Sequence, residues 1–538
     1  MKQDRPLLVL IAGWALFSVA SIWLRPLWPV DETRYASVAW EMWLRGDFVV
    51  PHINGEPYSH KPPLLFWLIQ LGWGLFGVND WWPRLVAPLC ALAAVPLTLR
   101  LGRLLWPESR AAHLLSVWVV FGTLLFAVFI TLTMFDLLLM LCTMAAMIGV
   151  VTLARGARRA GILWLGAGIG LGVLVKGPVI LLHVLPVAVL APWWAPGIRA
   201  NPGRWYLHLL LGVLLGAALA LAWALPAAYL GGEEYRRAIF WGQTAGRVSE
   251  SFAHRAPWWH YLPLLPLILF PWFVWPRFWK GLYETSAGRK HEGTKESTKF
   301  LACWLILTLI GFSLVSGKQA KYLVPMLPAF ALLAGHALAK ATAPARWWDM
   351  LPPVIGFLAF PAVLGYLRTR PEGMKLPEWV GEIPLWPIAV LALAAPALLF
   401  FCRKPAATQL RALAGATLIA IAVIGAGVIP AFVPYSDPGP AARHLAALQE
   451  ANVPLAHLGK YHAQYNFVGR LRTSIEIVDP PEVKDWVATH PAGQIITIER
   501  SRHDAKGIAS PEYQAPFRGA WVQVWRGAAL LVARPELR

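Results

Sequence analysis

The chain has 538 residues, of which 57% are hydrophobic and only 14% are charged. A typical soluble domain is about 25% charged, and a soluble fold of this length has too little interior to bury so much apolar surface. The composition excludes a purely soluble protein and predicts a polytopic helical membrane protein. The net charge of +19 is unexpected in a largely lipid-facing chain. The basic residues therefore either lie in loops on one side of the membrane or bind an anionic ligand.

The first apolar run, 7–24, follows Lys2 and Arg5 and resembles the start of a signal peptide. The Trp-Leu-Arg-Pro string that ends it is bulky and basic, so no small-residue cleavage site follows. We therefore expect an uncleaved first span with its N-terminus inside the cell.

Further apolar runs predict about thirteen transmembrane spans in all. After 7–24 they lie at 81–104, 112–130, 136–154, 161–175, 178–195, 206–230, 259–279, 299–316, 321–339, 350–367, 384–402 and 411–433. The run 64–78 is short for a hydrocarbon layer of roughly 30 Å. We expect it to form a helix at the outer surface without crossing.

The basic connectors support this topology. If 64–78 does not cross, they all fall on the cytoplasmic side, as the positive-inside rule requires. The residues concerned are Arg100, Arg103, Arg110, Arg155, Arg158, Arg159, Arg199, Arg204, Arg277, Lys280, Lys290, Lys295, Lys299, Lys340, Arg346, Arg403, Lys404 and Arg411. The predicted domains are then a transmembrane domain, 1–434, with outer loops at 28–80 and 231–257, and an outer soluble domain, 435–538.

The soluble domain has the pattern of a small α/β fold. Its predicted elements are helices at 438–451 and 481–490 and strands at 455–458, 474–478, 494–499, 520–526 and 528–533. The alternation Trp-Val-Gln-Val-Trp at 521–525 is typical of a strand with one buried face. The domain has neither a glycine-rich phosphate loop nor metal-ligand spacing.

Charges interrupt apolar sequence at three outer helix ends, where the topology predicts few positive residues. They are Lys176, Lys318 with Lys321, and Asp136. A lone lysine there can simply extend its amine to the interface. Ionisable groups near a membrane are costly, however, so function is the first hypothesis for each of them.

The first outer loop is the richest in polar groups. Asp31 and Glu32 open it, an amphipathic segment follows over 34–45, and Tyr58 to Lys61 lie near its end. The two carboxylates either cap the following helix and interact with its dipole or act as a catalytic pair beside a cationic phosphate clamp.

Carboxylates facing Lys, Arg and Tyr suggest transfer chemistry on a lipid phosphate. Cations neutralise a phosphate as it leaves, and a carboxylate orients or deprotonates the nucleophile. The absence of a nucleotide-binding motif favours a lipid-linked sugar donor. The chemistry does not demand a metal, although His60, Glu56 and His254 are weak candidates for zinc or another divalent cation.

Several strings carry a family resemblance. Residues 31–35 read Asp-Glu-Thr-Arg-Tyr, 46–55 read Gly-Asp-Phe-Val-Val-Pro-His-Ile-Asn-Gly, and 58–63 read Tyr-Ser-His-Lys-Pro-Pro. With Lys-Gly-Pro at 176–178 and Lys-x-x-Lys-Tyr-x-x-Pro at 318–325, they resemble bacterial membrane glycosyltransferases of the GT-C superfamily, relatives of the protein O-mannosyltransferases. Within that superfamily the chain most resembles the lipid A 4-amino-4-deoxy-L-arabinose transferases.

The resemblance implies an inverting pentosyl transfer from undecaprenyl phosphate to a phosphate of lipid A. The reaction would take place on the periplasmic face of a Gram-negative inner membrane and confer resistance to polymyxin. The expected partners are the undecaprenyl-phosphate-linked sugar, lipid A and the bilayer, with no nucleic acid and no required cofactor.

The resemblance also suggests residue roles. The catalytic candidates are Asp31, which matches the family's key carboxylate, Asp136 as a second carboxylate, and Glu32. The donor-phosphate candidates are Lys61, Arg247, Tyr58, Tyr322, Lys318 and Lys176. One departure is His60, which stands where many relatives have an acidic residue.

Two other functions stay open at this point. A sister transferase would use the same lipid with another sugar or acceptor, including protein O-glycosylation or the lipopolysaccharide core. A lipid flippase or transporter should instead place ionisable groups in mid-span, with internal repeats and broken helices. The clustering of charge at helix ends disfavours the second of these.

Overall fold

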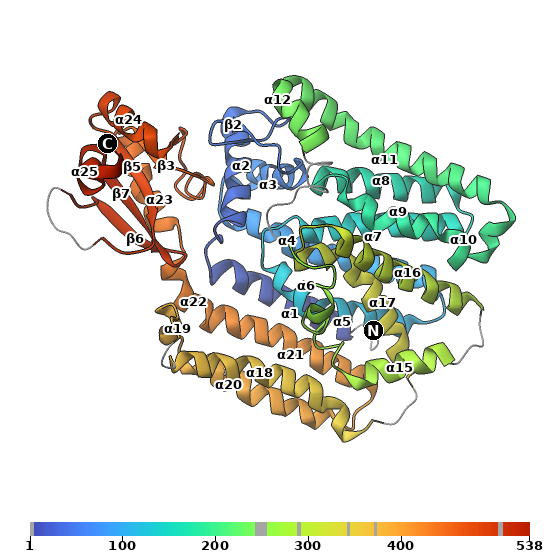
Figure 1. Cartoon of the computed structure of the whole chain (residues 1–538). Coiled ribbons are helices and arrows are strands. Elements are labelled where there is room, and N and C mark those ends of the chain that lie inside the picture. The colour runs from blue at the N-terminus through green and yellow to red at the C-terminus, as the bar shows by residue number, and fades with distance from the viewer. Residues whose placement is uncertain are drawn as a thin grey trace.

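A computed structural model describes residues 5–242, 255–287, 292–341, 345–370, 374–503 and 509–537. The chain forms a large helical bundle with a small sheet-containing domain at one end, on the left in Figure 1. This agrees with the predicted polytopic membrane fold and soluble α/β domain.

Among the described residues, nine helices are long and apolar enough to cross a bilayer. They are α1 (Arg5–Trp23), α4 (Trp81–Leu105), α7 (Asp136–Ala154), α8 (Arg158–Lys176), α11 (Pro202–Leu230), α16 (Glu292–Leu314), η4 with α17 (Ala320–Met326 and Leu327–Lys340), η5 with α18 (Trp347–Met350 and Leu351–Arg368), and α21 with α22 and η7 (Ala406–Gly427, Ile429–Phe432 and Val433–Tyr435). The pair α5 (Arg110–Gly122) and α6 (Leu124–Ile130) passes the same test together but is bent by 67°.

The remaining helices of the bundle are shorter. Three are apolar: α3 (Leu64–Phe76), α9 (Val179–Val189) and α20 with η6 (Leu385–Ala397 and Leu398–Phe401). The others are α10 (Ala191–Trp194), η1 (Pro196–Ala200), α12 (Gly232–Arg237), η2 (Ala238–Gly242), α15 (Pro276–Ala287) and α19 (Trp379–Glu382).

The predicted continuous span at 259–279 is wrong. This stretch contains only η3 (Leu262–Leu264) and α14 (Leu265–Ile268), followed by turns up to α15. Prolines at 257, 263, 266, 271 and 276 explain the difference. Each removes a backbone donor and clashes with the preceding turn, so apolar composition alone does not produce a helix here.

Glycines hold α7 and α8 close together. A methyl group on Gly149 would overlap the backbone nitrogen of Leu165, and one on Gly168 would overlap that of Ala146. Small residues at such contacts let two membrane helices approach along their backbones. Because the two helices are consecutive and antiparallel, this packing brings the first residue of α7 beside the last residue of α8.

The first outer loop forms α2 (Asp31–Arg45), a hairpin of β1 (His52–Ile53) and β2 (Glu56–Pro57), and then α3. Asn54 and Gly55 have positive φ angles of 52° and 93°, as the tight turn of a hairpin requires. The amphipathic segment is helical as predicted. Its apolar side chains Val38 and Met42 are fully buried within the protein core, which differs from the expected helix lying on the bilayer surface.

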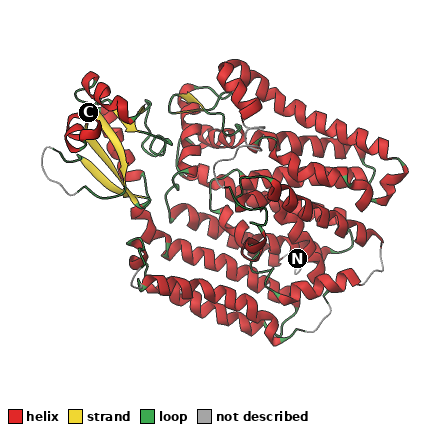
Figure 2. Ribbon diagram, viewed as in Figure 1, coloured by secondary structure: helices red, strands yellow, loops and turns green. Residues whose placement is uncertain are grey.

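The C-terminal domain has a five-stranded sheet of order β4-β3-β5-β7-β6, with β3 parallel to β4 and β5 and with β7 antiparallel to β5 and β6. Its strands are yellow in Figure 2. The elements are α23 (Gly439–Glu450), β3 (Leu455–Leu458), β4 (Glu476–Val478), η8 (Pro480–Glu482), α24 (Val483–Thr489), β5 (Gln494–Glu499), β6 (Tyr513–Phe517), β7 (Ala520–Arg526), α25 (Gly527–Ala533) and η9 (Pro535–Leu537).

Two features of this domain differ from expectation. The strand predicted at 528–533 is the helix α25, whose Ala529 and Leu530 pack into the core formed with α24. Strand β6 was missed because Pro516 interrupts its pattern, and a strand that contains proline is confined to a sheet edge. The edge is where β6 lies.

A segment of the C-terminal domain docks on the first outer loop. Ser37 Oγ donates to Ala463 O (2.7 Å) and accepts from Phe467 N (3.0 Å). Trp40 Nε1 donates to Leu471 O (2.8 Å), and Asn54 exchanges two hydrogen bonds with the backbone of Ile475. The segment 461–475 therefore fixes both α2 and the hairpin.

Candidate active site

The candidate site begins at the first turn of α2, at the end of the bundle that carries the C-terminal domain. Asp31 is 39% exposed and pairs with Arg34 through Oδ1. Its Oδ2 lies 3.6 Å from Nζ of Lys321, which belongs to η4. The carboxylate is thus held between two cations from distant parts of the chain and remains accessible.

A second ion pair lies next to it. Asp136, the first residue of α7, is only 1% exposed, and its Oδ1 lies 2.5 Å from Nζ of Lys176, the last residue of α8. The Lys176 ammonium lies 5.0 Å from the ring centroid of Tyr322. Tyr322 directly follows Lys321, so η4 contributes to both pairs and connects them.

Tyr35 lies within electrostatic range of both carboxylates. Its ring packs edge-on against Phe135, at a centroid distance of 4.8 Å. Burial, assisted by the negative charges of Asp31 and Asp136, raises the pKa of Tyr35 well above its ordinary value. The phenol therefore stays protonated and can donate a hydrogen bond.

Glu32 has a different environment from Asp31. It is 2% exposed, and Arg25 binds it at 2.5 and 3.0 Å. The backbone N–H groups of Trp28 (2.8 Å) and Thr133 (2.5 Å) also donate to it. These contacts join α2 to the loops that follow α1 and α6. We therefore assign Glu32 a structural role in place of the predicted catalytic one.

Lys318 is also occupied by structural contacts. It is 6% exposed, and its ammonium donates to the carbonyl oxygens of Ala256 (2.9 Å) and Val315 (2.6 Å). The lysine thus caps the end of α16 and ties it to the segment that starts at 255. This geometry favours a structural role for Lys318 over the predicted phosphate contact.

The hairpin positions the Tyr58–Lys61 string. Tyr58 N donates to Pro51 O (2.7 Å), and the buried Tyr58 ring stacks on His60 at 5.4 Å. Lys61 is partly exposed, and its ammonium donates to His60 O (3.3 Å). Electrostatic interaction between Tyr58 and both Arg34 and Tyr35 places this string beside the first turn of α2.

The two metal candidates that the structure describes, Glu56 and His60, belong to no group that could hold an ion. Within the described parts of the chain, no group of three His, Cys, Asp or Glu side chains is arranged to hold an ion. Glu56 and His60 are both exposed. Arg247 and His254 lie outside the described residues.

The site contains two residues that were not among the predicted site residues, Arg34 and Tyr35, and a third, Lys321, that the sequence singled out beside Lys318 without a specific role. Arg34 lies three positions after Asp31, the spacing that places two side chains on one helix face. Lys321 belongs to the Lys-x-x-Lys-Tyr string, in which Lys318 was favoured. The sequence contained both signals but did not show which lysine meets the carboxylate.

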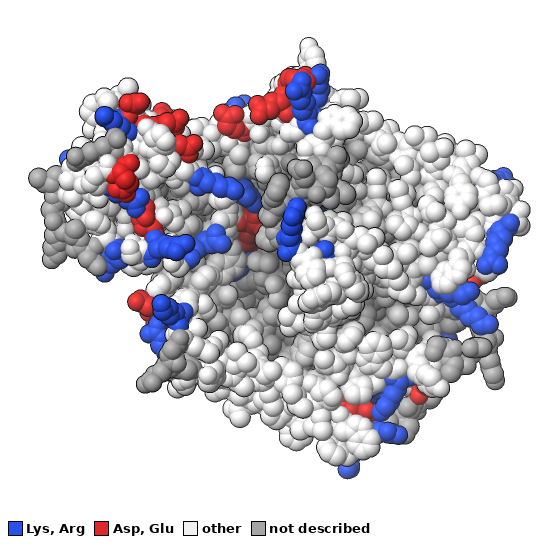
Figure 3. All heavy atoms as spheres, viewed as in Figure 1, with Lys and Arg blue, Asp and Glu red and all other residues white. Residues whose placement is uncertain are grey.

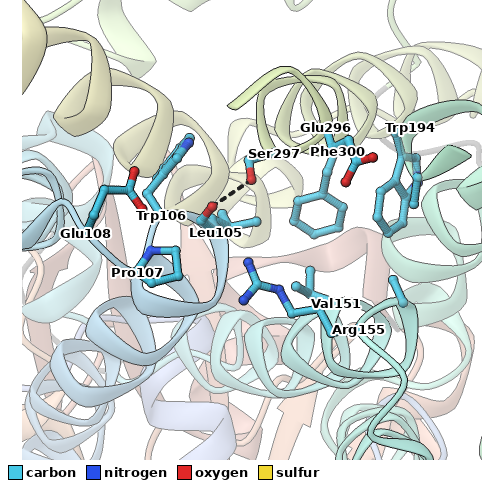
Figure 4. A pocket seen from close by; sticks show the side chains of 12 residues that line it. Leu105, Trp106, Pro107, Glu108, Val151, Arg155, Trp194, Glu296, Ser297 and Phe300 are labelled. Atoms are coloured by element: carbon cyan, nitrogen blue, oxygen red, sulfur yellow. Dashed lines mark hydrogen bonds between the residues drawn. The ribbon is translucent and has the colours of Figure 1, made fainter. Parts of the chain in front are cut away.

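A cavity of about 310 Å³ lies at the other end of the bundle (Figure 4). Arg155, Glu296 and Trp194 help to line it. Arg155 follows the last residue of α7, whereas Asp136 begins that helix, and nineteen residues of helix span about 28 Å. The cavity is therefore separate from the candidate site.

Charged side chains of both signs lie around the hollow between the C-terminal domain and the bundle. Figure 3 shows Lys and Arg side chains on both sides of the hollow between the C-terminal domain and the bundle, with acidic side chains between them. Cations that surround two carboxylates at a membrane surface suit the binding of a phosphate-bearing lipid.

Comparison with known proteins agrees with this interpretation. The family model of dolichyl-phosphate-mannose-protein mannosyltransferases matches residues 6–235. The undecaprenyl phosphate-alpha-4-amino-4-deoxy-L-arabinose arabinosyl transferase of Pseudomonas paraeruginosa is 33% identical over 394 residues, 69% of this chain and 67% of the relative. Its namesake in Pseudomonas aeruginosa is 34% identical over 382 residues, with the same shares.

A solved structure has a fold similar to that of this chain. Crystalline ArnT from Cupriavidus metallidurans, bound to undecaprenyl phosphate, has a TM-score of 0.77 and 19% identity, with 97% of this chain and 98% of that chain covered. Fold and family together define an integral membrane glycosyltransferase of the GT-C class that uses a polyprenyl-phosphate sugar donor. Within that class, the chain belongs to the undecaprenyl phosphate-alpha-4-amino-4-deoxy-L-arabinose arabinosyl transferase family.

Proposed function

We propose that the protein transfers 4-amino-4-deoxy-L-arabinose from undecaprenyl phosphate to a phosphate of lipid A. The observation that carries the proposal is the accessible Asp31 carboxylate held between Arg34 and Lys321, next to the Asp136–Lys176 pair. Family membership supports the sugar and the donor lipid. In a Gram-negative inner membrane, the reaction would modify lipopolysaccharide and confer resistance to polymyxin.

We propose that the site and the C-terminal domain face the periplasm. Arg155 and the ends of α4, α10 and α16 line the cavity at the end of the bundle opposite the site. The positive-inside rule favours the cytoplasm for an end that carries a basic connector such as Arg155.

The cations act on the leaving group. The acceptor phosphate oxygen forms a bond to the anomeric carbon as the bond from that carbon to the donor phosphate oxygen breaks. The electron pair moves to the departing undecaprenyl phosphate, and an in-line attack inverts the anomeric carbon. Lys321, Arg34 and Lys61 supply positive charge where this negative charge grows. Lys176, which is paired with Asp136 and lies over the ring of Tyr322, adds to this positive charge.

Asp31 acts on the nucleophile. A phosphate monoester has a second pKa of about 6, so a fraction of the acceptor still carries a proton at neutral pH. The half-exposed Asp31 carboxylate can accept that proton and orient the attacking oxygen. Asp136 is fully buried in its ion pair, which makes it a positioning residue for Lys176.

The test is transfer from undecaprenyl-phosphate-linked aminoarabinose to lipid A by the purified protein in bilayers. We expect Asp31→Asn and Lys61→Ala to abolish transfer or reduce it by at least about 100-fold, the scale for loss of a charge-stabilising or acid–base group. Arg236→Ala is the matched control, because its side chain is exposed and pairs only with Glu233 among described residues.

A different acceptor is the second candidate, and the same assay distinguishes it. Transfer to a peptide or to lipopolysaccharide core, with none to lipid A, would establish a sister transferase. Full activity in both the Asp31 and Lys61 variants would place the catalytic centre elsewhere.

A further inference from the structure

We propose that the C-terminal domain completes the site with a patch formed by two cations, Lys460 and Arg518, and the imidazole of His462, and that this patch binds the phosphate of the acceptor. This inference rests on the proposed function, because it assigns an acceptor site next to the donor site. It gives the soluble domain a direct part in substrate binding.

The first support is geometric. Ser37 lies three residues after Arg34, on the same face of α2. Its hydroxyl is bonded to Ala463 and Phe467, so the segment that follows β3 is fixed one helical turn from Arg34. His462 is the neighbour of Ala463 and is therefore held at the first turn of α2.

Two further cations of the domain lie within electrostatic range of His462. Burial lowers the pKa of His462, and positive charge on Arg34, Lys460 and Arg518 lowers it further, whereas Asp31 opposes the shift. His462 is thus within electrostatic range of two cations from the C-terminal domain and two charged residues from the first turn of α2. At neutral pH it is an uncharged ring able to donate or accept a hydrogen bond.

The backbone holds Arg518 in place. Arg518 lies at the turn between β6 and β7 with a φ of 55°, and its N–H donates to Tyr435 O (2.7 Å), which ties the turn to the end of the last membrane helix. Lys460 follows the end of β3 by two residues. Both side chains are exposed.

The two cations of the patch differ from three other cations of their domain. Arg470, Arg526 and Arg534 each pair with a carboxylate. Among the described residues, no carboxylate lies within ion-pair distance of Lys460 or Arg518, in contrast to those three. Like charges placed together without a counter-ion repel one another, and a bound anion removes that cost.

The acceptor phosphate fits this position better than the donor phosphate does. Lys176, Lys321 and Tyr322 all come from the ends of membrane helices, which suits a lipid phosphate leaving from the bilayer side. Lys460 and Arg518 belong to the soluble domain and, like Asp31, lie within electrostatic range of His462. A phosphate on a large sugar headgroup would reach them from the water side.

The experiment separates acceptor binding from donor binding. The full-length protein in lipid nanodiscs carries Lys460→Ala, Arg518→Ala, both changes, or Lys484→Ala, an exposed lysine on α24 in the same domain as control. Initial rates are measured against lipid A and, separately, against undecaprenyl-phosphate-linked aminoarabinose. We expect the double variant to raise the KM for lipid A by about tenfold or more, as for loss of charge-assisted hydrogen bonds, with the donor KM and kcat within about twofold.

A second measurement keeps the inference independent of catalysis. Without donor, binding of bis-phosphorylated lipid A is compared with binding of its dephosphorylated form. Wild type should prefer the phosphorylated lipid, and the double variant should lose that preference while Lys484→Ala keeps it. An unchanged acceptor KM, an equal rise in the donor KM, or an unaltered preference would overturn the assignment. Specific binding by wild type without transfer would instead reject the proposed function and leave the patch intact.

Discussion

Two neighbouring carboxylates, Asp31 and Glu32, have opposite environments because successive residues of a helix point about 100° apart. Asp31 faces the accessible hollow between Arg34 and Lys321. Glu32 faces inward, where Arg25 and two backbone N–H groups satisfy it. Adjacent positions of one helical turn therefore hold the proposed catalytic carboxylate and a structural one. The sequence alone presented the two residues as a pair.

Replacing Glu32 should lower stability much more than replacing Asp31. Glu32→Gln leaves Arg25 buried without its counter-charge, and loss of one partner of a buried ion pair costs about 3–5 kcal/mol. Thermal unfolding in detergent should show a lower Tm for Glu32→Gln, whereas Asp31→Asn should unfold near wild type and lack activity. Equal Tm values for the two variants would contradict these assignments.

The same variant has an expected pH dependence. Burial alone would raise the pKa of Glu32, but Arg25 and the backbone donors outweigh it and hold the pKa below its ordinary value of 4.5. Because the pKa of Glu32 is lower in the folded state, its ionised carboxylate stabilises the folded protein fully above about pH 4.5. This stabilisation is lost as the pH falls through the pKa of the folded state. The Tm difference between wild type and Glu32→Gln should therefore narrow on acidification.

At the scale of elements, prediction succeeded where a local pattern and the tertiary environment agree. The bounds of β3, β5 and β7 were predicted residue for residue, because each alternates or is apolar between clear turn signals. It failed at 259–279, where prolines override hydropathy, and at 528–533, where Ala and Leu allow a helix that packs on α24. Short apolar runs do not distinguish helix from strand by composition.

Close packing of α7 on α8 should be necessary for the Asp136–Lys176 pair. Gly168→Leu would force side-chain atoms into the backbone of Ala146 and separate the helices, at a cost of about 1–3 kcal/mol for overpacking. Because the pair lies at the helix ends, we expect sugar transfer to fall by at least about tenfold even in protein that still inserts and purifies.

Gly415→Leu in α21 is the matched control, because no atom lies within 4 Å of a Cβ at that position. Transfer assays on both purified variants, normalised to folded protein, make the comparison. Normal activity in Gly168→Leu would show that the ion pair tolerates movement of the two helices.

At the scale of the molecule, the positive charge lies in more than one place. Arg155, one of the connectors predicted to be cytoplasmic, lines the cavity at the far end of the bundle, while a second group surrounds Asp31 and Asp136. The sequence predicts a catalytic or phosphate-binding role for Asp31, Asp136 and Lys176 of this second group. It did not predict that Lys321, rather than Lys318, faces the site, nor that segment 461–475 covers α2, because those contacts join parts of the chain hundreds of residues apart.

Docking of the C-terminal domain should therefore control activity through α2. Ser37→Ala removes the hydroxyl shared by Ala463 O and Phe467 N and leaves both buried groups unpaired, at about 1–3 kcal/mol each. We expect faster hydrogen exchange across 461–475 and a transfer rate at least about fivefold lower, while the membrane helices exchange as in wild type. Ser501→Ala is the control, because this exposed serine lies on the same domain far along the chain from the docked segment. Faster exchange across 461–475 with full activity would show that catalysis proceeds without the docked domain. Faster exchange together with a lower transfer rate would show that docking of the soluble domain is required for activity.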